Sequence, residues 1–110
     1  MITIPDNAAP ADVVGQTDIL AGQDWLVKET LVQFANWIQR GNFPWEAMQQ
    51  VEPMAFQRGS AGLVISQGHH RWVAARLAGV DIPVEIEVLD DYWPGIIPYA
   101  HTWDQGGLEG

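Results

Sequence analysis

Residues 63–79 read LVISQGHHRWVAARLAG and decide the fold of this chain. The apolar residues 63–65 are typical of a buried strand, and the polar residues 66–68 interrupt that run. Good helix formers follow over residues 69–78 and end at Gly79, a residue suited to the position just beyond a helix. The stretch therefore predicts a strand, a tight turn and a helix in direct succession.

The turn between this strand and this helix is suited to an anion. Backbone N–H groups and the positive end of the helix dipole point at it. The first helical turn carries His69, His70 and Arg71, and cations there oppose the dipole unless an anion is bound. We therefore predict a phosphate or carboxylate site that consists of Ser66, Gln67, Gly68, His69, His70, Arg71 and, further along the helix, Arg76.

Each of these residues also has a plain structural interpretation. One of the two histidines could satisfy a buried polar group, because neighbours on a helix point about 100° apart and must contact different partners. Arg76 could be a solvated cation paired with a carboxylate. Glu29 and Glu46, the acidic residues of the preceding helices, are interpreted as solvated rather than catalytic.

The stretch Gly68-His69-His70-Arg71, followed by Ala74-Ala75, resembles the phosphate-binding box of the ParB/sulfiredoxin-like superfamily. The resemblance covers about residues 24–90. Its Gly-His-His-Arg form is similar to that of ParB-like nucleases and toxin modules. His69 stands where sulfiredoxins have their catalytic cysteine, and because the chain has no Cys, repair of cysteine sulfinic acid is excluded.

The resemblance implies both a fold and a chemistry. The fold would be a small α/β (α+β) domain with a mixed sheet and packed helices. Arg71 and one histidine would hold phosphate oxygens, and the other histidine would act as general acid or base. The implied function is cleavage of phosphoester or phosphoanhydride bonds, as a nuclease or a nucleotide hydrolase, with Mg²⁺ accompanying a nucleotide such as ATP or CTP.

The elements around this stretch are predicted from periodicity and turn residues. Asp24 is a suitable cap for a helix that ends at Arg40, and Pro44 suits the start of a short second helix. Residues 53–58 and 63–65 are predicted to form a hairpin around the loop Gly59–Gly62, and residues 82–88 a further strand. Residues 91–110 form an aromatic, Pro/Gly-rich tail. The last five residues of this tail are predicted to be disordered.

Composition limits the function further. A chain of 110 residues with 47% hydrophobic residues forms one domain. Its formal net charge of -9 repels nucleic acid and anionic membranes at long range, which favours a small nucleotide over a polymer. No metal site is predicted, because His69, His70 and His101 lack helical i, i+4 spacing, and Asp90 or Asp91 could complete such a cluster only through the fold.

Two function classes stay open at this point. The first is a catalytic module that acts in the cytoplasm, by analogy the effector part of a larger secreted toxin that a cognate immunity protein neutralises. The second is a non-catalytic module whose interaction with another protein is gated by a nucleotide. No apolar run is long enough to span a membrane, so no membrane partner is expected.

Overall fold

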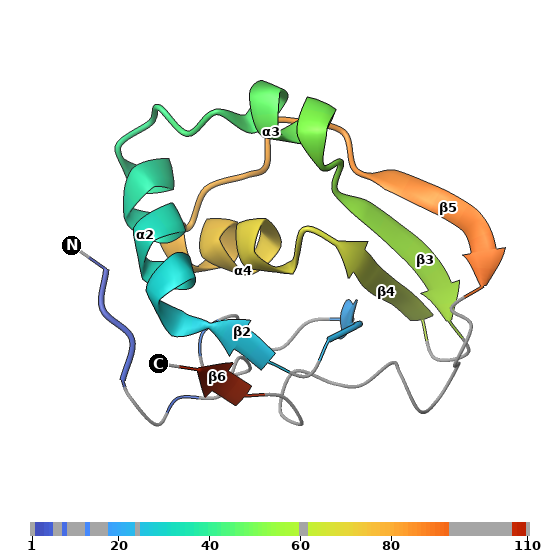
Figure 1. The fold of residues 1–110 in the computed structure, drawn as a ribbon, viewed down its shortest axis with the longest axis horizontal. Helices are drawn as coiled ribbons and strands as arrows, with labels where there is room; N and C mark the ends of the chain where they lie inside the picture. Colours follow the sequence, from blue (N-terminus) through green and yellow to red (C-terminus); the bar gives the residue numbers. More distant parts are fainter. Residues whose placement is uncertain are drawn as a thin grey trace.

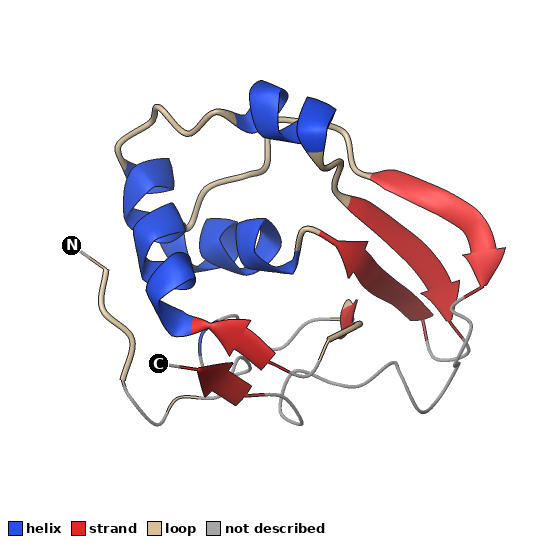
Figure 2. Ribbon diagram, viewed as in Figure 1, coloured by secondary structure: helices blue, strands red, loops and turns tan. Residues whose placement is uncertain are grey.

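The computed structural model describes residues 2–5, 8, 13, 18–23, 25–59, 62–92 and 107–109. Along the chain its elements are β1 (Leu20–Ala21), β2 (Trp25–Val27), α2 (Lys28–Gln39), α3 (Trp45–Val51), β3 (Ala55–Gly59), β4 (Gly62–Gln67), α4 (His69–Ala78), β5 (Glu87–Tyr92) and β6 (Gly107–Glu109). A mixed sheet and packed helices form a small α/β fold, as the sequence predicts (Figures 1 and 2).

The main sheet has four strands in the order β1-β4-β3-β5. β3 and β4 form the predicted antiparallel hairpin, and their pairing continues to Gly59 opposite Gly62. β1 is parallel to β4 and β5 is parallel to β3. β4 leads through Gly68 into α4, which packs against α2 beside the sheet (Figure 1).

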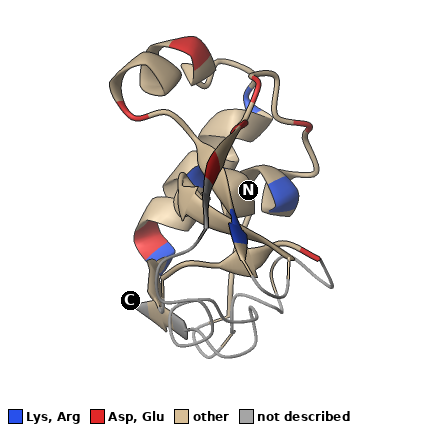
Figure 3. Cartoon of the chain, turned by 90° about the vertical axis from the view of Figure 1, so that its right-hand side faces the viewer, with Lys and Arg blue, Asp and Glu red and all other residues tan. Residues whose placement is uncertain are grey.

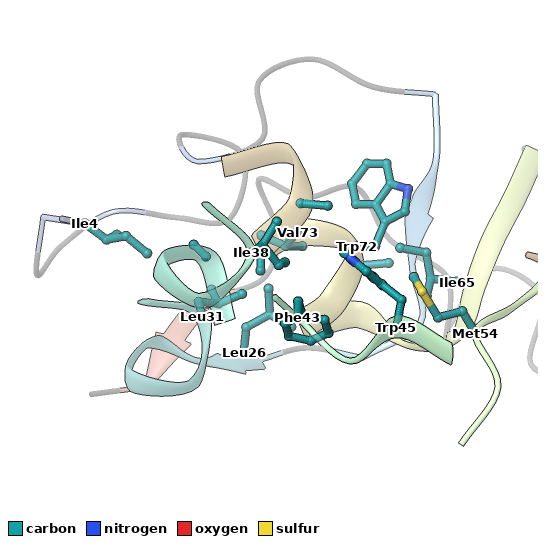
Figure 4. Packing of buried hydrophobic residues seen from close by; sticks show 14 residues of the cluster. Ile4, Leu26, Leu31, Ile38, Phe43, Trp45, Met54, Ile65, Trp72 and Val73 are labelled. Atoms are coloured by element: carbon teal, nitrogen blue, oxygen red, sulfur yellow. The ribbon is translucent and has the colours of Figure 1, made fainter. Parts of the chain in front are cut away.

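The hydrophobic core lies mainly between α2 and α4 and extends to β4 (Figure 4). Leu31 of α2, Ile65 of β4 and Val73 of α4 have no exposed surface. An aromatic contact joins α2 to the segment before α3, since the Phe43 ring lies 5.3 Å from Phe34 and 5.0 Å from Trp37 between centroids. The core therefore joins α2, α4, β4 and the segment before α3.

The predicted helix start at Asp24 is wrong. Residues Trp25–Val27 form β2, which pairs in parallel with β6, and α2 begins only at Lys28 with Val27 in the cap position. In β2 the Leu26 side chain is buried while Trp25 and Val27 are exposed, the alternation expected of a strand. The partner strand lies about eighty residues away in the sequence, so no local signal indicated it.

Other parts of the structure also differ from the sequence predictions, and β3, predicted from residue 53, begins at Ala55. β4 continues to Gln67, so the turn before α4 consists of Gly68 alone. β5 begins at Glu87 rather than at residue 82. Gly107–Glu109, in the part of the tail predicted to be disordered, forms β6.

The late start of β5 has a physical reason. Ile82, Val84 and Ile86 do alternate and are partly buried against the core. The pattern therefore correctly indicated that these side chains pack toward the core. Burial does not require a strand partner, and Pro83 has no N–H group to donate to one. The alternation therefore reflects packing rather than strand pairing.

Candidate functional site

A cleft of about 640 Å³ opens where β4 meets α4. One wall consists of the consecutive residues 66–71, which include six of the seven residues predicted to form the anion site. The other walls come from α2, α3 and the two segments that flank them. The lining residues from these parts are Gln23, Thr30, Phe34, Ala47, Met48, Val51 and Glu52.

Gly68 makes the turn between β4 and α4. Its φ of 94° is in the left-handed region, which side chains other than that of glycine rarely adopt. Its carbonyl accepts the first helical hydrogen bond, from the Trp72 N–H at 2.9 Å. A Cβ at this position would lie 2.7 Å from Cγ of the buried Met54. Both the conformation and the space require glycine here, and the turn directs residues 69–71 toward the cleft wall.

The two histidines hold the N-terminal segment against the start of α4. The Gly22 N–H donates to Nε2 of His69 at 2.9 Å, and the Val27 N–H donates to Nε2 of His70 at 2.9 Å. A ring nitrogen that accepts a hydrogen bond carries no proton, so these bonds require neutral imidazoles with the proton on Nδ1. The expectation of three cations in the first helical turn therefore reduces to one, Arg71, while the interpretation of the histidines as structural acceptors gains support.

The pH dependence of the free energy of unfolding should report the protonation state of His70. Burial lowers the pKa of this imidazole below its ordinary value of 6.5, so the unfolded chain takes up a proton more readily than the folded one. The contribution of neutral His70 to the free energy of unfolding is therefore complete above about pH 6.5. It falls as the pH drops below that value. We expect this fall in urea unfolding measured between pH 8 and 5.5.

Two variants separate the hydrogen bond from the titration. His70→Gln keeps an acceptor but cannot titrate, so its stability should vary less with pH than that of the wild type. His70→Ala leaves the Val27 N–H without its partner and should cost roughly 1–3 kcal/mol at pH 8. An unchanged pH profile in His70→Gln would assign the titration to another group.

Arg71 is the cation that faces the cleft, and it is only 4% exposed. Its Nη2 donates to the backbone carbonyl of Glu52. Its Nη1 is buried and has no hydrogen-bond partner among the described residues. Burial lowers the pKa of the guanidinium and the nearby Glu52 carboxylate opposes that change. A buried charged donor without a partner is costly, and an anion in the cleft would supply the missing acceptor.

Of the remaining predicted site residues, Ser66 and Gln67 line the cleft and Arg76 does not. Ser66 Oγ donates to the Ala55 carbonyl at 3.1 Å, so this hydroxyl supports the hairpin as it lines the cleft. Gln67 is exposed at the cleft wall. Arg76 does not reach the cleft: its guanidinium lies 5.6 Å from the centre of the Trp72 ring, and the residue lines a second hollow. Arg76 is therefore not among the described residues that line the cleft.

Glu52 is the cleft residue that the sequence analysis missed. It follows directly after α3, its side chain is exposed, and both its backbone and its charge act on Arg71. Glu46, which was considered instead, does not line the cleft. Nothing in the sequence distinguishes the two, because only the packing of α3 brings residue 52 to the start of α4.

Few of the described residues near the cleft are metal ligands. Among the described residues, no group of three His, Cys, Asp or Glu side chains is arranged to hold a metal ion. His101 lies outside the described residues. Glu52 is the only Asp or Glu among the described residues that line the cleft. A Mg²⁺ ion that entered with a nucleotide would be held mainly by the phosphate oxygens and by water, because a single carboxylate among the described residues lines the cleft.

Comparison with known proteins gave no match among protein-family models, curated proteins or solved structures. In the described part of the chain, no helix is long and apolar enough to cross a membrane. The assignment of function therefore depends on the chemistry of the cleft itself.

Proposed function

We propose that this chain binds the phosphate group of a nucleotide or nucleic acid at the start of α4 and hydrolyses a phosphoester or phosphoanhydride bond. The observation that carries the proposal is the buried Nη1 of Arg71, which has no protein acceptor within the described residues and belongs to a cleft residue. Phosphate oxygens are strong acceptors for guanidinium donors. The α4 N-terminus adds backbone N–H groups of favourable polarity.

In this proposal Glu52 activates water. The histidines accept backbone hydrogen bonds through Nε2 and are therefore not free bases at those atoms, whereas the Glu52 carboxylate is exposed at the cleft. Glu52 takes a proton from water as the water oxygen bonds to phosphorus, and the P–O bond to the leaving group breaks. The leaving oxygen takes up that proton, and Arg71 stabilises the charge on the phosphate oxygens.

The distribution of charge favours a small nucleotide over a polymer. The five Lys and Arg residues all belong to the described part of the chain and occupy separate positions on α2, β3 and α4 and at the end of α2. They are scattered rather than gathered on one face (Figure 3). Binding to nucleic acid normally uses a basic patch, and the net charge of -9 opposes a polyanion.

The resemblance of residues 68–71 to ParB-like nucleases and toxin modules supports the same class of chemistry. It also suggests a biological role for the chain, which would be an effector module that acts in the cytoplasm. Such a module would be delivered within a larger secreted protein and neutralised by a cognate immunity protein. This part of the proposal rests on analogy between short sequences.

A second candidate function is a non-catalytic module gated by a nucleotide. The histidine hydrogen bonds favour it, because they connect the cleft wall to Gly22 and Val27 in the N-terminal segment. A ligand that changed the position of the histidines would also shift that segment, and with it the exposed Trp25 and Val27 of β2.

A substrate panel tests the proposal. Purified protein is incubated with nucleoside mono-, di- and triphosphates, DNA and RNA, each with and without Mg²⁺. We expect products from small nucleotides and not from the polymers. Glu52→Gln should lower turnover about 10²- to 10⁴-fold, and the matched control Glu46→Gln on the exposed surface of α3 should not.

The panel also separates the two candidate functions. Binding of nucleotides without any product would support the gated module. Turnover that Glu52→Gln leaves unchanged would contradict the assignment of Glu52 as the base.

A further inference from the structure

The cleft has one charged wall and one apolar wall. Arg71 and the α4 N-terminus form the charged part of the lining, and the apolar part consists of Phe34 of α2 together with Met48 and Val51 of α3. The Val51 side chain is 88% exposed and Phe34 and Met48 are partly buried. An apolar side chain that is almost fully exposed at the rim of a cleft gains stability when a ligand covers it.

The charges in the cleft balance one another. Among the described residues that line it, Arg71 is the only Lys or Arg and Glu52 the only Asp or Glu, and the hydrogen bonds of both histidines require neutral rings. A triphosphate carries several negative charges and normally meets several cations. A single phosphate group needs only the one guanidinium with the helix N-terminus.

We propose that the ligand of this cleft is a phosphate monoester with one phosphate group and an apolar or aromatic body that lies against Phe34, Met48 and Val51. The inference rests on the proposed phosphate site and narrows it, because it excludes di- and triphosphates as preferred ligands. The volume of about 640 Å³ is within the range of small-molecule sites, roughly 300–1,000 Å³. The alcohol released on hydrolysis would then carry the apolar body.

Titration calorimetry with simple probes tests this ligand class. Phenyl phosphate and methyl phosphate share the charged group and differ in the body, so covering the apolar wall should make phenyl phosphate bind about tenfold tighter. Along the series AMP, ADP and ATP without Mg²⁺, affinity should not rise. The four nucleoside monophosphates distinguish a nucleoside from another aromatic body: affinity equal to or above that of phenyl phosphate indicates a nucleoside.

Two matched variants locate the effect. Val51→Ser should reduce the affinity for phenyl phosphate about twofold to fivefold and leave methyl phosphate unchanged. Val80→Ser is the control, since Val80 is also exposed but lines the second hollow beside Arg76; it should change neither affinity. Neither side chain is buried, so both variants should fold.

The outcomes separate this inference from the proposed function. Equal binding of phenyl and methyl phosphate, or tenfold tighter binding of ATP than of AMP, overturns the inference and leaves the phosphate site standing. Absence of binding by every phosphate compound overturns both. A phenyl advantage that Val51→Ser does not reduce overturns the placement of the body on this wall.

Discussion

Replacing Arg71 with methionine should strongly reduce phosphate binding and turnover while leaving the protein about as stable as the wild type. The side chain is 4% exposed and its Nη1 has no protein partner in the described structure. A methionine of similar length fills most of the space and removes a buried charge. The lost hydrogen bond from Nη2 to the Glu52 carbonyl costs about 1 kcal/mol, and relief of the desolvated charge offsets this cost.

The effect on function should be large. If Arg71 stabilises charge on phosphate in the transition state, its removal should lower turnover on the order of 10² to 10³. Arg71→Ala is a poorer test, because it would also leave a cavity. Arg76→Met is the matched control, the same change on the same helix at an exposed position over Trp72, and it should retain binding and turnover.

Urea unfolding and phosphate binding, measured on both variants, distinguish a phosphate-binding role of Arg71 from a structural role. A loss of several kcal/mol in Arg71→Met, with activity lost only in proportion to the unfolded fraction, would make Arg71 a structural residue. A well-folded Arg71→Met variant with full binding would end the proposal that this cleft is a phosphate site.

Gly68→Ala should be the most destabilising of the substitutions considered at the site. The left-handed conformation, with φ of 94°, costs a residue with a side chain about 1–2 kcal/mol. The added methyl group would also lie 2.7 Å from Cγ of Met54, which has no exposed surface and cannot easily move; such overpacking costs about 1–3 kcal/mol. The expected total is roughly 2–5 kcal/mol.

Gly79→Ala provides the comparison for Gly68→Ala. Gly79 follows the same helix with φ of 70°, but a Cβ there would meet no atom within 4 Å. Only the conformational cost of about 1–2 kcal/mol applies. The difference between the two variants in urea unfolding measures the contact with Met54, and equal losses would show that this contact relaxes without cost.

The sequence by itself determined the elements that local signals specify. The hairpin, α3, and α4 from His69 to Ala78 with its glycine boundaries were all predicted. The reason is that apolar runs, glycine at positive φ and helix-forming residues act within a few positions of one another. The same local order placed residues 66–71 together, which is why most of the candidate site could be predicted.

Only the tertiary structure decided the chemistry of that site. The histidines are held as neutral acceptors by backbone groups 47 and 43 residues away, and Arg71 is buried against the Glu52 carbonyl 19 residues away. The packing of distant segments likewise decides that Glu52 lines the cleft and Arg76 does not. It also decides that β2 pairs with β6. Charge state and burial are set by neighbours in space, and the local sequence does not specify those neighbours.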